Sequence, residues 1–250
     1  MLGSPGTLPV GASAFSPASI LGLKLWLAGN RSPFTLNAGK VSQWDDLSGN
    51  GSHAIQSTAT LQPAYVASGI GGLPGIKGDG TDDLLELSTT FNNDYLFDAT
   101  VKTVFAVFRT GGVAQANKRI FTGQQGGSSR FGLFLGVNYA PLYHYRTDAP
   151  ALGTLADGSI ANLALNTNYI MAIRQNGASI EGYLNSLTPT ATASDGNTSS
   201  ETGPVPTNIG GPGSNITIAE IIVTSGVDPS DAQISLTQTY LANKYGVTLT

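Results

Sequence analysis

Residues 41–54, which read VSQWDDLSGNGSHA, decide the fold that we predict for this chain. The stretch begins as an alternating strand and then enters a polar, glycine-rich corner. Trp44 is one of two tryptophans in the sequence, and we expect its large indole to lie in the core. The residues after it are of the types that cap turns and tolerate left-handed backbone, so Asp45 and Asp46 are predicted to cap this corner. The pattern indicates a strand that buries an indole and then turns sharply at one edge of a sheet.

The composition indicates a single β-rich domain. A chain of 250 residues is long enough for a substantial core, and all-β sandwiches of this length often form one domain. Charged residues make up only 11%, well below the usual quarter, and Gly, Ser, Thr and Asn carry the polarity instead. The lysines and arginines are scattered singly in a chain of net charge −4. Because no basic stripe is present to neutralise phosphates, we expect no nucleic-acid partner.

The first 19 residues differ in character from the rest. They carry Pro5, Pro9 and Pro17 among small residues, and such a segment cannot bury enough surface to order itself. They show no signal-peptide pattern, no run in the chain reaches the roughly 18 apolar residues of a membrane span, and there is no cysteine to form disulfides. We therefore predict an extended arm over residues 1–19 and one domain over residues 20–250. The arm either docks on a neighbouring surface or packs along its own domain.

Short alternating or β-branched runs predict the strands of this domain. Residues 102–109 (KTVFAVFR) form the most hydrophobic run, which predicts a strand covered on both faces. Asn176-Gly177 predicts a hairpin with a type I′ turn. Further strands are expected at residues 20–28, 40–44, 81–88, 119–122, 130–137, 142–146, 169–174, 179–185 and 216–224.

One helix is predicted near the C-terminus. The residues Asp228-Pro229-Ser230-Asp231 supply a capping side chain, a proline for the first turn and early acidic charge. Apolar residues at helical spacing follow, and Gly246 is the expected stop.

Four segments together give the chain a family resemblance. They are GLKLWLAGN (residues 22–30), VSQWDDLSGNGSHAIQ (41–56), GIKGDGTDDLLEL (75–87) and IAEIIVTSGVDPSDAQISLTQTYLANKYGV (218–247). In this order they resemble the laminin-G-like branch of the concanavalin A-like lectin/glucanase superfamily, over nearly the whole chain after residue 20. The resemblance implies an all-β fold, a two-sheet antiparallel jelly-roll sandwich with one short C-terminal helix. The family often has an acidic residue at Ala28-Gly29-Asn30 and Asp-Gly at Asn185-Ser186, so its calcium and ligand sites do not carry over directly.

The resemblance also implies a function. Such domains occur in virion and tail proteins of tailed bacteriophages and in secreted carbohydrate-binding and adhesive proteins. The first hypothesis is a non-enzymatic structural protein on a phage virion surface, a head decoration or a fibre or tail subunit made in the host cytoplasm. On this view the arm binds other virion proteins, the head adheres weakly to host glycans, and the protein is a homo-oligomer, a trimer by analogy. The alternative is a free extracellular carbohydrate-binding module or lectin, and neither hypothesis needs a cofactor.

A glycoside hydrolase is the third and disfavoured hypothesis. Retaining glucanases of the superfamily carry the motif E-x-D-x-x-E on one strand, which places two carboxyl groups about 5 Å apart. The glutamates here are Glu86, Glu181, Glu201 and Glu220, and none has a second carboxylate at that spacing. The sequence therefore predicts that the chain is not an enzyme.

The predicted glycan contacts are Tyr139, Tyr143, Tyr145 and Arg146, because aromatic rings stack on sugars while arginine binds their hydroxyls. On a strand, Tyr143 and Tyr145 share one side, and His144 and Arg146 share the other. The alternative is that the tyrosines belong to the core, with their hydroxyls at the rim. The polar loop of residues 123–130 is a second candidate.

Three acidic residues, Asp79, Asp82 and Asp83, lie together in the segment GDGTDD. Carboxylates in a turn are the ligands that calcium prefers, but a calcium cage needs six to eight oxygens. We therefore predict a β-turn with solvated acids and no metal site, and leave calcium as the open alternative.

Overall fold

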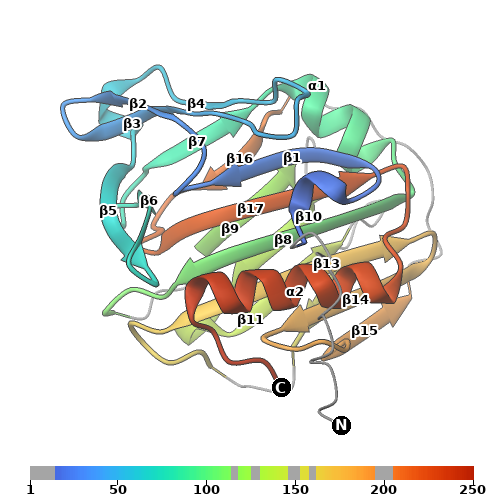
Figure 1. Ribbon diagram of the computed structural model, residues 1–250. Helices are drawn as coiled ribbons and strands as arrows, with labels where there is room; N and C mark the ends of the chain where they lie inside the picture. Colours follow the sequence, from blue (N-terminus) through green and yellow to red (C-terminus); the bar gives the residue numbers. More distant parts are fainter. Residues whose placement is uncertain (1–14, 114–117, 125–129, 146–152, 158–161, 195–204) are drawn as a thin grey trace, which may run out of the picture.

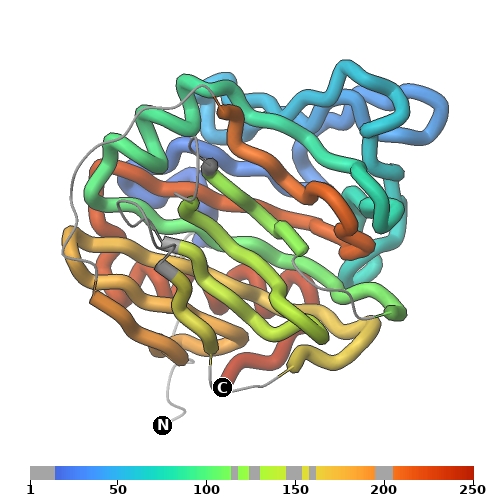
Figure 2. Tube along the Cα trace, turned by 180° about the vertical axis from the view of Figure 1, so that it is seen from behind, coloured from blue at the N-terminus to red at the C-terminus, as the bar shows by residue number. Residues whose placement is uncertain are grey.

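The computed structural model describes residues 15–113, 118–124, 130–145, 153–157, 162–194 and 205–250. Its strands form two antiparallel layers that pack face to face, with one long helix across the outside of the first layer (Figure 1). Figure 2 shows the second layer from behind. In order of pairing, the first sheet contains β1 (Leu23–Ala28), β17 (Thr217–Ser225), β8 (Val101–Arg109), β13 (Asn168–Asn176), β14 (Ser179–Leu184) and β15 (Ala191–Ser194). The second contains β7 (Leu84–Leu87), β16 (Thr207–Gly210), β9 (Lys118–Gln124), β10 (Arg130–Leu135), β11 (Pro141–Tyr145) and β12 (Gly153–Ala156).

Shorter elements close one end of the sandwich and link the sheets. They are β2 (Phe34–Asn37), β3 (Lys40–Trp44), β4 (Ala54–Ile55), β5 (Ala64–Ile70), β6 (Leu73–Lys77), α1 (Thr89–Phe91), the π-helical turn Asn92–Phe97 and the 3-10 turns Pro17–Ser19, Ala59–Leu61 and Val137–Tyr139. The long helix is α2 (Asp231–Tyr245). The predicted fold class is confirmed: an all-β, two-sheet antiparallel jelly-roll sandwich with a C-terminal helix. None of the helices among the described residues has the length and apolar character needed to cross a bilayer.

The main core fills the space between the sheets, and its residues come from one side of each strand. On β8, Val104 and Phe108 point into this core, while Phe105 and Val107 point to the outside and lie under α2. The strand is therefore covered on both faces, as predicted. Trp44 has no exposed surface and packs in the same core, which confirms it as an anchor.

Helix α2 covers the outer face of the first sheet with a second apolar cluster that includes Ile234, Leu241 and Tyr245 (Figure 1). Its N-cap is Ser230, which forms a capping box with Gln233. Gly246 ends the helix in left-handed backbone at φ 66°. Asp228 does not cap the helix, because its carboxylate binds the guanidinium of Arg174 at 2.6 Å instead.

Strict alternation does not hold within β17. It would place Ile218 and Ile222 on one face, but Ile218 lies between the sheets and Ile222 lies under α2. A β-bulge between Ile218 and Glu220 sets one additional residue against β8 and reverses the faces. The consequence is that Glu220 points toward the helix.

The predicted hairpin is present, but its turn lies one residue further on. Asn176 pairs with Ser179, so Gly177 and Ala178 are the two turn residues. Gly177 has φ 56°, and Ala178 is not among the residues with positive φ. A type I′ turn needs positive φ at both positions, so the prediction of that type was wrong.

The described part of the N-terminal segment packs along its own domain. Phe15 contacts Tyr240 of α2 edge-on, with ring centroids 5.8 Å apart. Residues 1–14 of the predicted arm lie outside the described residues. The corner after Trp44 is capped by Asp46 as predicted, since its carboxylate accepts hydrogen bonds from the backbone N–H groups of Trp26, Ser48 and Ser52. For Asp45 the prediction was wrong, because its carboxylate accepts from the side-chain amide of Gln43 instead.

Candidate functional site

A row of side chains crosses the outer face of the second sheet. Directly paired residues in neighbouring strands share a face, and the pairing is continuous from β7 to β12. The sequence neighbours Phe121, Leu133 and Tyr143 point into the core, so the row points outward. Its members are Glu86, Asn208, Thr122, Gly132, His144 and Thr154. We call it the polar row.

The middle of the polar row is buried and its ends are accessible. Thr122 has no exposed surface, and His144 and Asn208 are 7% and 9% exposed, whereas Glu86 and Thr154 are exposed. From Asn208 to His144 the row spans three strand spacings, or roughly 14 Å. Gly132 contributes no side chain to it.

Two arginines flank the polar row. Arg119 on β9 pairs with Phe134 on β10, and Arg130 begins β10 two residues before Gly132. Both are half-buried, and neither has an ion-pair partner within the described part of the chain. Burial and the charge of Arg130 lower the pKa of Arg119. Both guanidinium groups nevertheless stay charged, because arginine is not deprotonated in proteins.

His144 is the titratable group of this face. Burial, together with the charges of Arg130 and Arg119, lowers its pKa to about 4. The imidazole is therefore neutral at neutral pH, with one ring nitrogen as donor and the other as acceptor. Its ring packs against Phe134 with 3.8 Å between centroids, and both rings are buried.

Four buried polar atoms on this face have no hydrogen-bond partner among the described residues. They are Thr122 Oγ1, Arg130 Nε, His144 Nδ1 and Asn208 Oδ1. Buried polar groups in folded proteins are almost always bonded, and each exception costs about 1–3 kcal/mol. The hydroxyl of Thr122 and the imidazole of His144 can donate or accept a hydrogen bond. Arg130 Nε donates, and Asn208 Oδ1 accepts. The group matches a ligand that carries several hydroxyls.

A pocket of about 380 Å³ adjoins the Glu86 end of the polar row. It is lined by Gly51, Ser52, His53, Ile55, Ser57, Glu86, Leu87, Ser88 and Pro206. His53 Nδ1 accepts a hydrogen bond from the Asp46 N–H at 3.2 Å, which fixes the ring at the pocket wall. Glu86 therefore belongs both to the row and to a hollow large enough for a sugar ring.

The structure places Tyr139 and Tyr143 in the core with no exposed surface. Tyr143 donates to Asp157 Oδ2 at 3.0 Å, and burial raises its pKa well above the usual value. Tyr139 donates to the carbonyl of Val113 at 2.9 Å. A fully buried ring has no face on which a sugar can stack, so for these two residues the structure supports the core alternative. The side chain of Tyr145, all of Arg146 and residues 125–129 of the loop candidate lie outside the described residues.

The predicted glycan contacts and the polar row meet on β11. The alternation within residues 142–146 separated His144 from Tyr143 correctly, and the predicted contacts took Tyr143 and Tyr145 from one side and Arg146 from the side of His144. Arg119, Thr122 and Asn208 were missed. The signal that finds them is the pairing register, which joins strands far apart in the sequence.

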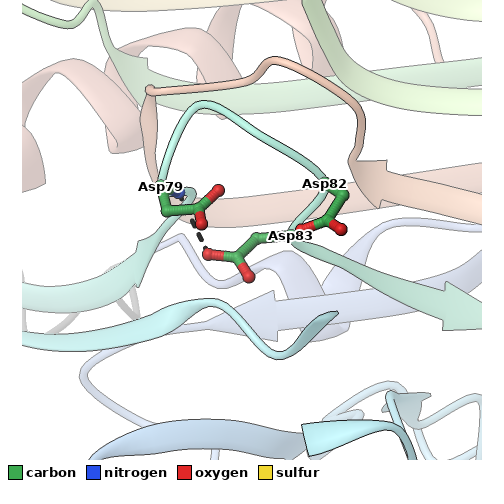
Figure 3. A group of neighbouring side chains, drawn as sticks. All are labelled: Asp79, Asp82 and Asp83. Atoms are coloured by element: carbon green, nitrogen blue, oxygen red, sulfur yellow. Dashed lines mark hydrogen bonds between the residues drawn. The ribbon is translucent and has the colours of Figure 1, made fainter. Parts of the chain in front are cut away.

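The three aspartates form the group of described residues whose oxygens come close enough to share an ion, within 4.8 Å of one another (Figure 3). Asp83 accepts the N–H of Asp79 at 3.0 Å, and Asp79 accepts the N–H of Thr81 at 2.7 Å. Burial and the neighbouring Asp79 raise the pKa of Asp83, and Lys40 Nζ lies 3.8 Å from its Oδ1. These bonds are those of the predicted turn. With Asp82, the acids supply only part of the six to eight oxygens of a calcium cage.

The sequence matches no family model and no curated protein. Solved structures do share the fold. A sialidase from Trypanosoma rangeli is 17% identical with a TM-score of 0.60, over 96% of this chain and 36% of that one. Domain 4 of AbnA, a GH43 extracellular arabinanase from Geobacillus stearothermophilus in complex with arabinotriose, is 10% identical with a TM-score of 0.56, over 87% and 98%. The receptor-binding domain of botulinum neurotoxin D is 13% identical with a TM-score of 0.63, over 90% and 54%.

These comparisons establish a class: the chain has a β-sandwich, jelly-roll-like fold found in domains of glycan-related proteins. It spans about a third of the sialidase chains that it matches. At these identities the likeness shows the fold alone. The concanavalin A-like and laminin-G-like assignment stays a prediction from the sequence.

The prediction that the chain is not an enzyme is overturned. The structures that share its fold include chains of a sialidase and a domain of a GH43 arabinanase. The exclusion rested on a missing carboxylate pair, but not all glycoside hydrolases use that pair, and sialidases have a tyrosine nucleophile. One spacing rule was therefore too narrow to exclude the class.

Proposed function

We propose that the chain is a carbohydrate-binding domain of a glycan-active protein, and that sugar binds along the polar row. The observation that carries the proposal is the set of four buried, unbonded polar atoms on one sheet face. Thr122, His144 and Asn208 can each donate to or accept from a sugar hydroxyl.

The relatives in fold support the same class. Domain 4 of AbnA is described in complex with arabinotriose, and the Trypanosoma rangeli sialidase in complex with sialic acid. Those ligands belong to those proteins. For this chain they support carbohydrate as the kind of ligand, while the polar row supplies the location.

The test is binding of the full chain to an oligosaccharide array, followed by isothermal titration calorimetry on any sugar that binds. Thr122→Val removes one unbonded hydroxyl at almost constant volume. We expect its affinity to fall about threefold to tenfold, the worth of one hydrogen bond.

Thr224→Val is the matched control. Thr224 has no exposed surface and its Oγ1 is also unbonded, but it lies in the first sheet. It should bind as the unmodified chain does. Silence of multimerised protein across the array, or an equal loss in both variants, would contradict the proposed site.

Chromatography of the bound oligosaccharide after incubation reports whether the chain also cleaves it. Shortened products would add turnover to binding, and an intact sugar would limit the proposal to recognition. Either result leaves the location of the site to the Thr122 and Thr224 variants.

The virion hypothesis rests on the family resemblance alone and stays a prediction, together with its surface location and its trimer. Docking of the arm now concerns residues 1–14, because Phe15 packs on the chain's own Tyr240. Deletion of residues 1–14 should abolish assembly into a particle and leave the domain folded. Normal incorporation of the shortened chain would refute docking.

A further inference from the structure

We propose that the polar row selects anionic sugars, which carry a carboxylate or a sulfate ester, and that Arg119 and Arg130 bind the anionic group. The inference rests on the proposed carbohydrate binding and adds the class of ligand.

The first observation is unpaired charge. Arg174, elsewhere in the molecule, shows how this protein treats a half-buried guanidinium: Asp228, Asp231 and Glu181 all bind it, at 2.6–3.1 Å. Arg119 and Arg130 have no such acid among the described residues. The like charges are close enough that each of them lowers the pKa of His144. An anion between them would remove this repulsion and restore the pairing that Arg174 has.

The second observation is directed hydrogen bonding. The Nε–H of Arg130 is buried and unbonded, and a guanidinium fork matches the paired oxygens of a carboxylate or sulfate. The stem of Arg119 passes so close to Gly211 that a Cβ there would lie 3.1 Å from Arg119 Cδ. One arginine thus packs closely on the backbone, and the other has a donor without an acceptor.

The third observation is the distribution of charge along the row. His144 stays neutral beside the arginines and so contributes a hydrogen bond without a further charge. Glu86, the acid of the row, stands at one end, and Asn208 lies between it and Thr122, which shares β9 with Arg119. A ligand with its anionic group at the arginines keeps its neutral hydroxyls toward Glu86. The charge pattern therefore fixes the direction in which the sugar lies.

The experiment compares three trisaccharides of one sugar type, titrated into the full chain: galactose, galacturonic acid and sulfated galactose. We expect the two anionic sugars to bind at least tenfold more tightly than the neutral one, with an advantage that shrinks as salt is raised. The carboxylated and sulfated arms distinguish which anion fits better. Sodium acetate and sodium sulfate serve as competitors without a sugar ring.

Variants locate the effect. Arg130→Gln should weaken the anionic sugars about tenfold to a hundredfold, as loss of a charge-assisted bond does, and the neutral sugar less than twofold. Arg130→Lys keeps the charge without the guanidinium fork, so its affinity for the anionic sugars should lie between those of the unmodified chain and Arg130→Gln. Arg109→Gln, an equal change of charge in the first sheet, should alter nothing. Circular dichroism and melting temperature confirm that each variant is folded.

The outcomes separate the two proposals. Equal affinity for neutral and anionic sugars, or equal losses for both in Arg130→Gln, overturns the anionic selection and leaves carbohydrate binding intact. Displacement by acetate or sulfate at the concentration of the sugar overturns sugar recognition at the arginines. Failure of every sugar to bind overturns both proposals.

Discussion

The outer faces of the two sheets differ in how they pair their charged side chains. On the first sheet, Glu220 has no exposed surface, yet it accepts four hydrogen bonds: from Trp26 Nε1 at 2.7 Å, Lys244 Nζ at 2.6 Å, Tyr245 at 2.9 Å and Tyr240 at 3.2 Å. On the second sheet, Thr122 Oγ1, His144 Nδ1 and Asn208 Oδ1 have no partner among the described residues. The first face also contains an unbonded hydroxyl, that of Thr224, but its buried carboxylate is fully bonded within the fold.

The difference separates structure from recognition. The Glu220 cluster fastens α2 to β1 and β17, and its members are fully used within the fold. The unbonded groups of the polar row lower the stability of the folded chain by themselves and gain partners only when something binds. Binding surfaces typically contain groups that lower the stability of the free protein.

The largest expected effect on the free energy of unfolding comes from Glu220, on the outer face of the first sheet. Glu220→Leu leaves the buried indole N–H of Trp26 without its acceptor and the ammonium of Lys244 with the hydroxyl of Tyr240 in place of a carboxylate. Breaking a buried pair on one side costs about 3–5 kcal/mol, and we expect that loss in the free energy of unfolding from urea titrations. Burial already lowers the pKa of Lys244, so part of the loss will appear as deprotonation of the lysine.

Glu86→Leu is the control, because this exposed acid of the second sheet has no side-chain hydrogen-bond or ion-pair partner among the described residues. It should change the free energy of unfolding by less than about 0.5 kcal/mol. A loss below 1 kcal/mol for Glu220→Leu would show that the two faces do not differ in the way described.

Local sequence signals predicted the elements better than their faces. Ser230 and Gly246 bounded α2 because caps act within one turn of chain. The face of Glu220 depends on a bulge against β8, and nothing local in the repeated Ile-x-Ile pattern reveals that bulge. The turn at Gly177 moved by one residue for a similar reason, since pairing with β8 fixes the register of the hairpin.

The polar row could not be predicted from the sequence for a related physical reason. Alternation tells which residues of a strand share a side, but not which side is the core, so Tyr143 and His144 were equally eligible. Asn208 lies in the four-residue strand β16, in a region poor in strand signals. Long-range strand pairing places Asn208 in one row with Thr122 and His144, and local sequence patterns do not reveal such pairing.

The second prediction uses the low pKa of His144. The folded chain binds the proton near pH 4 and the unfolded chain near pH 6.5, so between these values the unfolded state holds more protons. The free energy of unfolding should therefore fall as pH falls from about 6.5 to 4, by on the order of 3 kcal/mol from this group. His144→Asn should remove that part of the slope in urea titrations at pH 7, 5.5 and 4.5.

The carboxylates of the chain titrate in the same window, so the informative quantity is the difference between the unmodified chain and the variant at each pH. Thr224→Val, which changes no titratable group, should follow the unmodified chain at every pH. Parallel curves for His144→Asn would mean that the imidazole is not buried against the two arginines.

The smallest expected change in the free energy of unfolding is that of Thr122→Val, and its sign is the informative result. Thr122→Val deletes a buried hydroxyl without a partner, so the folded chain loses a desolvation cost and no hydrogen bond. We expect the free energy of unfolding to stay constant or to rise by up to about 1 kcal/mol, while sugar affinity falls. Thr224→Val should show the same gain in stability with no loss of affinity, since its hydroxyl is equally unbonded on a face that α2 covers. Destabilisation by Thr122→Val would mean that its hydroxyl already has a partner in solution, and the contrast between the two faces would then lose one of its members.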